Sequence, residues 1–111
     1  MQRHTQVSLA ILVLLSTVLA RADVVTDWNV KANELVVEAK LGTPPAMRML
    51  AIVHTAVYEA ANAVTQRYLD GALKLDAAPG ASLDAAVAAA NRVTLLKLLP
   101  AIQPAIDSAY Q

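Results

Sequence analysis

The chain has 111 residues, enough for one small domain, and its 9 basic and 9 acidic residues balance to a formal net charge of zero. That balance excludes a strongly basic chain of the kind that binds nucleic acid, and the absence of cysteine excludes disulfides and thiolate metal sites. Hydrophobic residues make up 57% of the sequence but aromatic residues only 4%, so the apolar content is mostly Ala, Val and Leu.

The first 22 residues have the three parts of a secretory signal peptide. Arg3 supplies a positive charge, the apolar run 7–19 follows, and Ala20 and Ala22 place small residues at both positions of an A-x-A cleavage site. The apolar run has about 13 residues, fewer than the roughly 20 that span a bilayer as a helix. We therefore expect cleavage after Ala22 and export to the periplasm or the extracellular space. The arginine between the two alanines leaves an uncleaved membrane anchor as the alternative.

Residues 23–111 are predicted to fold as helices, and the first of these begins near Thr26 or Asp27, either of which can cap it. Gly42 fits the left-handed residue that commonly closes a helix. Thr43 caps the next helix, and Pro44 stands at its first position, where a missing N–H costs nothing. The apolar stripe of the first helix consists of Trp28, Ala32, Leu35, Val36 and Ala39.

A second helix is expected over residues 45–64, followed by a loop over residues 66–80. Alanines on the other faces of this helix keep it thin, so we expect it to be buried on more than one side. Its apolar stripe consists of Ala46, Leu50, Val53, Val57, Ala61 and Val64. The apolar residues of the loop are Tyr68, Leu69, Leu73 and Leu75.

Ser82 caps a third helix that runs to about Leu99, where Pro100 ends it. Pro104 starts a last helical segment that reaches the end of the sequence in under two turns, which is marginal in water unless the segment packs or continues. Outside the first 22 residues the sequence has no alternating apolar and polar run of useful length. We therefore expect an all-α fold, a helical-bundle fragment with about three helices and a truncated fourth.

Several segments resemble the opening of exported bacterial vanadium-dependent haloperoxidase-like proteins, which belong to the type 2 phosphatidic acid phosphatase superfamily. The resemblance covers most of residues 23–111 and implies that they are the N-terminal helical scaffold of a larger all-α domain. The segments that carry it are 24–29 (VVTDWN), 44–45 (PP), 50–63 (LAIVHTAVYEAANA), 67–68 (RY), 79–82 (PGAS) and 85–90 (AAVAAA).

In that family, late motifs hold a vanadate or phosphate oxyanion: a Lys with a downstream Arg-Pro, a Pro-Ser-Gly-His element, and a Ser-Arg followed by a His. An oxyanion requires such clustered positive charge and aimed donors. None of these motifs occurs in this sequence, so no catalytic or cofactor-binding residue is carried over. For the full-length family the resemblance implies vanadate as cofactor or phosphate as substrate. Halide oxidation and phosphate-ester hydrolysis both stay open.

The best polar group that the sequence itself offers is His54, Glu59 and Asn62 on the second helix, a weak candidate for a site. A functional interpretation pairs His54 as a base with the carboxylate of Glu59. The alternative is a histidine that packs against a neighbouring helix. One histidine and scattered carboxylates do not supply three or four convergent ligands, so no metal site is expected.

Other residues with chemical potential have structural interpretations. Ser82 lacks a base and stands where a cap is needed. Trp28 lies on its apolar stripe and is expected in the core. Arg48, Arg67 and Arg92 fall on different elements without a Gly-rich cradle, so we expect solvated side chains or ion pairs between helices.

Three classes of function remain. The first is a catalytically silent scaffold of a haloperoxidase-like or phosphatase-like enzyme, whose partners are missing C-terminal helices of the same domain. The second is a small exported helical protein that binds another protein or forms a homo-oligomer. The third is a membrane-anchored helical module with an uncleaved signal. Apart from that third class, a membrane is expected as a partner only during export.

Overall fold

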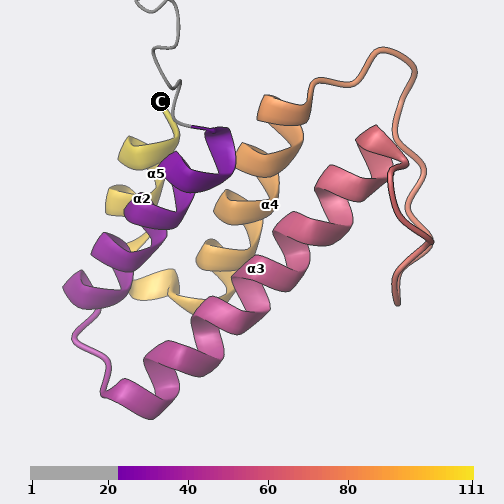
Figure 1. Cartoon of the computed structure of the whole chain (residues 1–111). Helices are drawn as coiled ribbons and strands as arrows, with labels where there is room; N and C mark the ends of the chain where they lie inside the picture. Colours follow the sequence, from indigo (N-terminus) through magenta and orange to yellow (C-terminus); the bar gives the residue numbers. More distant parts are fainter. Residues whose placement is uncertain (1–22) are drawn as a thin grey trace, which may run out of the picture.

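The computed structural model describes residues 23–111, which form a bundle of helices (Figure 1). In chain order the elements are α2 (Val24–Glu38), α3 (Thr43–Thr65), α4 (Leu83–Leu98), the 3₁₀-helix η1 (Pro100–Ile102) and α5 (Gln103–Tyr110). No β-strand occurs among these residues, and the predicted all-α class is confirmed. The predicted signal peptide, with Ala20 and Ala22, lies outside the described residues.

Helix α4 is the centre of the bundle, because it packs against α3, α2, α5 and η1. Its alanines allow close approach on several sides, while Val87 and Leu95 are completely buried. Ile106 of α5 and Val53 of α3 reach the same core. The other buried apolar side chains are Trp28, Ala32, Leu35, Val36, Met49, Val57 and Leu99.

The start of α2 differs from the prediction. Asp23 is the N-cap, and its carboxylate accepts a hydrogen bond from the backbone N–H of Val25 at 3.4 Å. Thr26 and Asp27 therefore lie inside the first turn, where the charge of Asp27 complements the helix dipole. The predicted stripe is confirmed for its first four residues, and Ala39 is half-buried.

The turn between α2 and α3 corrects the role of Gly42. Lys40 takes the left-handed conformation with φ 54°, and its N–H donates to the carbonyl of Val37 at 3.0 Å. Gly42 has an ordinary φ of −66° and is the N-cap of α3. Thr43 is the first residue of that helix, and no side chain caps it. A capping glycine was the expected choice, but a lysine in this exposed turn occupies the strained position instead.

Helix α3 buries one apolar face along its length and a second side only near its C-terminal end. Met49, Val53 and Val57 are buried, together with Glu59 and Asn62. Within the described residues the opposite side of the helix is open, with Met47, Ile52 and Tyr58 exposed. Glu59 and Asn62 lie away from the side that Val53 and Val57 face, and residues 68–72 bond to them, so the expected burial on more than one side is confirmed at the C-terminal end of α3. Figure 1 shows α3 crossing the bundle and extending beyond it at its C-terminal end.

The segment 66–82 joins α3 to α4 and is called the strap below. Gln66 closes α3 in the left-handed conformation, with φ 48°. At the other end Ser82 caps α4 as predicted, and its hydroxyl accepts from the N–H of Ala85 at 3.3 Å. All residues of the strap are exposed, so the four apolar residues expected there as anchors do not reach the core.

Helix α5 closes the bundle by returning to α2 (Figure 1). The ring of Tyr110 lies 6.2 Å from that of Trp28, and Lys31 donates to the carbonyl of Ala109 at 2.9 Å. Among the described residues no single helix is long and apolar enough to cross a membrane. Leu83–Leu98 and Pro100–Tyr110 meet that criterion only as a pair, and the pair is bent by 114°.

Candidate functional site

The polar residues predicted on the second helix lie on α3, and two of them meet at its C-terminal end. Asn62 is only 7% exposed. Its side-chain oxygen accepts from the N–H of Tyr68 at 2.9 Å, while its amide group donates to the carbonyls of Tyr68 at 3.1 Å and Leu69 at 3.3 Å. Both the oxygen and the nitrogen of the Asn62 side chain therefore bond to the backbone of the strap.

Glu59 lies three residues earlier, on the same face of α3. It is also 7% exposed, and its carboxylate accepts from the N–H of Ala72 at 3.0 Å. Gly71 approaches this carboxylate so closely that a methyl group there would overlap it. A buried carboxylate needs such donors, because burial without them is costly. Glu59 and Asn62 together bind the backbone of the strap.

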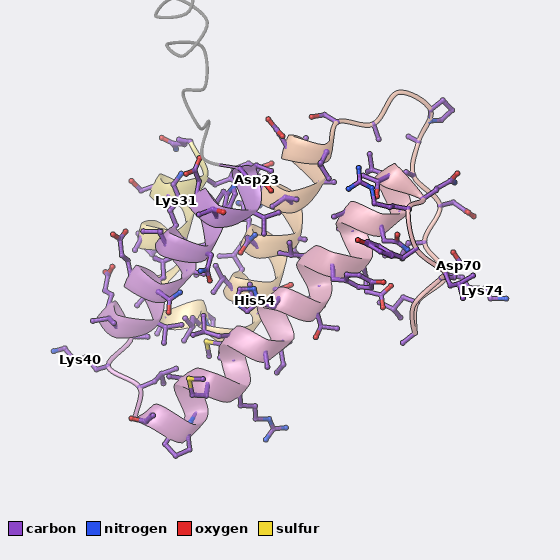
Figure 2. All side chains as sticks on the ribbon, viewed as in Figure 1. Asp23, Lys31, Lys40, His54, Asp70 and Lys74 are labelled. Atoms are coloured by element: carbon purple, nitrogen blue, oxygen red, sulfur yellow. The ribbon has the colours of Figure 1, made fainter. Side chains whose placement is uncertain are left out.

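His54 is separate from these two residues. It is an exposed residue of α3, labelled in Figure 2, and is not buried against a neighbouring helix. Among residues 23–111 no hydrogen bond or ion pair joins His54 to Glu59, whose carboxylate is held by Ala72. The structure therefore brings Glu59 and Asn62 together and leaves His54 apart, and the base–carboxylate pair is not assembled.

The structure also contains an apolar cleft that sequence reasoning did not identify. It lies where the first turns of α3 meet the end of α4, and its volume is about 460 Å³. Met49 and Ile52 are apolar residues of α3 that lie outside its predicted stripe. Their presence was the feature of the sequence that could have indicated the cleft. The residues that line the apolar cleft are Pro44, Pro45, Arg48, Met49, Ile52 and Leu98.

The three arginines considered for oxyanion binding are dispersed. Arg48 borders the apolar cleft, Arg67 is exposed on the strap, and Arg92 forms an ion pair with Asp107 at 2.7 Å. Two predictions are confirmed: Trp28 is a core residue, and Ser82 caps α4. In the part of the chain that the structure describes, no group of three or more His, Asp or Glu side chains is placed to hold a metal ion.

Comparison with known proteins adds no relative: no family model, no curated protein and no solved structure matches the chain. The functional argument therefore rests on the residues themselves. Two features stand out, the Glu59–Asn62 pair that holds the strap and the apolar cleft at the other end of α3.

Proposed function

We propose that residues 23–111 are the N-terminal helical scaffold of a larger, exported all-α enzyme domain similar to the vanadium-dependent haloperoxidase-like proteins. In this proposal the chain positions helices and contributes no catalytic group. The vanadate or phosphate oxyanion is bound by Arg-Pro, Pro-Ser-Gly-His and Ser-Arg…His motifs that follow it in the parent protein. The resemblance of segments 24–29 and 50–63 supports this choice of enzyme class.

The observation that carries the proposal is the open side of α3. This helix has 23 residues, a length of roughly 34 Å at 1.5 Å per residue. Neighbouring helices cover one of its faces, whereas Met47, Ile52 and the apolar cleft remain open to solvent. An exposed apolar cleft marks a place where another protein surface packs. We assign this surface to further helices of the same domain, because a side-chain-lined cleft between two helix ends suits a packed helix.

The first test is the source DNA, read through codon 111 and beyond in all frames. The proposal expects a coding sequence that carries the three oxyanion motifs downstream. A stop codon with none of these motifs in any frame would contradict it. In that case we would propose self-association through the apolar cleft. Sedimentation equilibrium would measure it.

The second test is vanadate binding, measured by ⁵¹V NMR on two purified proteins. The 111-residue chain is expected to leave the signal of free vanadate unchanged, whereas the longer product is expected to broaden and shift it. The longer product with its Ser-Gly-His histidine replaced by alanine is the matched control. Vanadate binding by the 111-residue chain alone would show that the scaffold assignment is wrong.

A further inference from the structure

The strap is long, exposed and weakly tied to the helices. All of its residues are exposed, and Leu69 reaches 92%. Its own backbone bonds lie at its two ends, from Gln66 to the carbonyl of Asn62 at 2.7 Å and from Ala81 to that of Ala78 at 3.0 Å. Packing against the core therefore does not fix the middle of the strap. Figure 2 shows its residues Asp70 and Lys74 to the side of the C-terminal half of α3, away from the other helices.

Two buried side chains hold the strap by four hydrogen bonds. Asn62 makes three of them, to the N–H and carbonyl of Tyr68 and to the carbonyl of Leu69, and Glu59 makes the fourth, to the N–H of Ala72. Two of the four bonds are donated by the strap, from the backbone N–H groups of Tyr68 and Ala72. Their neighbours in sequence have no such partner among the hydrogen bonds of the described residues.

Gly71 is part of the same arrangement. The carboxylate of Glu59 occupies the space that a Cβ atom at this position would need. Any other residue would push the carboxylate away from the N–H of Ala72. The hydrogen bonds of Asn62 also bring Tyr68 beside Tyr58, with ring centroids 6.2 Å apart. The exposed apolar side chains of the strap are thus held in one position by Glu59, Asn62 and Gly71.

We propose that Glu59, Asn62 and Gly71 form a latch, and that releasing the latch opens the strap while the helical bundle stays folded. A segment with few buried contacts opens at a lower free energy than the core. The contacts of the strap are hydrogen bonds to two side chains, whereas the helices share a continuous apolar core. The latch therefore makes the strap a separate conformational unit, which repositions Tyr68, Leu69 and Leu73 when it opens.

The test is amide hydrogen exchange, followed by NMR on the full chain. In the unaltered protein the N–H groups of Tyr68 and Ala72 are expected to exchange more slowly than those of Leu69, Asp70 and Leu73. Asn62→Leu keeps a side chain of similar size but removes both the acceptor of the Tyr68 N–H and the donor to the carbonyls of Tyr68 and Leu69. We expect it to speed exchange at Tyr68 by about tenfold, as loss of a hydrogen bond worth roughly 1.4 kcal/mol would.

Two further variants separate the latch from general damage. Gly71→Ala is expected to speed exchange at Ala72, whereas Glu59→Gln retains a side-chain oxygen and is expected to preserve protection there. Asn33→Leu on the exposed side of α2 is the matched control and should leave the strap unchanged. In every variant the N–H groups of Val87 and Leu95 are expected to keep their protection.

Three outcomes would overturn the proposal. Equal exchange at Tyr68, Ala72 and their neighbours in the unaltered protein would show that the latch does not form. Unchanged protection at Tyr68 in Asn62→Leu would show that Asn62 is not part of the latch. Loss of protection at Leu95 together with the strap would show that release unfolds the bundle, so that the strap is no separate unit.

Discussion

At the scale of single residues, Leu95 is the side chain on which the core depends most. It is completely buried on α4, the helix that contacts all the others. Leu95→Ala leaves a cavity, and we expect the free energy of unfolding to fall by about 2–5 kcal/mol. That is a large part of the roughly 5–15 kcal/mol that stabilises a typical domain.

The matched control is Val93→Ala, two residues earlier on the same helix, where the side chain is 51% exposed. We expect a change within about 0.5 kcal/mol. Urea unfolding followed by circular dichroism measures both variants. Equal midpoints for Leu95→Ala and Val93→Ala would contradict the position of α4 at the centre of the core.

The polar residues show why the candidate site was only partly predictable. The sequence identified Glu59 and Asn62 as a polar group on a helix, but it paired Glu59 with His54. Their actual partners are backbone groups of the strap, up to 13 residues away in sequence. Helical periodicity specifies which residues share a face, and it does not specify where an irregular segment returns to that face. The latch therefore became visible only in three dimensions.

At the scale of elements, the start of α4 depends on Ser82. Its hydroxyl satisfies one of the N–H groups that the first turn leaves unpaired. Ser82→Ala is expected to lower the free energy of unfolding by about 1 kcal/mol, and Ser82→Asp to retain the stability because aspartate also caps. The midpoints of urea unfolding compare the two variants. Equal stability of Ser82→Ala and Ser82→Asp would show that the cap does not stabilise α4.

Helix α5 has only 8 residues, so it depends on contacts with its neighbours. Arg92 on α4 donates twice to one oxygen of Asp107, at 3.0 and 2.7 Å, and Gln103 donates to the other at 3.3 Å. The two side chains are about one third exposed, so the pair is screened by water. A double-mutant cycle with Arg92→Ala and Asp107→Ala is expected to give a coupling free energy of roughly 0.2–1 kcal/mol.

The cycle is measured by urea unfolding at low and at high salt. The coupling should shrink at high salt, because ions screen a partly exposed pair. Gln103→Ala serves as the control, since it removes the weaker contact and leaves the ion pair in place. Strictly additive losses in the two single variants would show that the ion pair does not help to hold α5.

The elements themselves were largely predictable, and their ends were not. Ser82 and Pro100 marked α4 correctly because capping and proline geometry act locally. Gly42 was misleading, since a glycine is compatible with a helix start as well as with a helix end, and Lys40 took the left-handed position. The apolar cleft was missed because the prediction assigned a single apolar stripe to α3. Met49 and Ile52, which line the cleft, lie beside that stripe.

At the scale of the whole molecule, the helical bundle begins where the predicted cleavage ends. Cleavage after Ala22 would leave Asp23 as the first residue, and Asp23 is the side chain that caps α2. The cut therefore would leave the described fold complete. We expect the chain, expressed in a bacterium with two membranes, to be recovered from the periplasm with the intact mass of residues 23–111.

Ala20 and Ala22 decide this outcome, because the peptidase requires small side chains at both positions. Ala22→Leu is expected to leave residues 1–22 attached and to move the protein to the membrane fraction, where the apolar run 7–19 anchors it. Ala51→Ser, a small change at an exposed residue beyond the site, serves as the control and should be processed normally. An intact mass of all 111 residues in the unaltered protein, found with the membranes, would instead favour the anchored module.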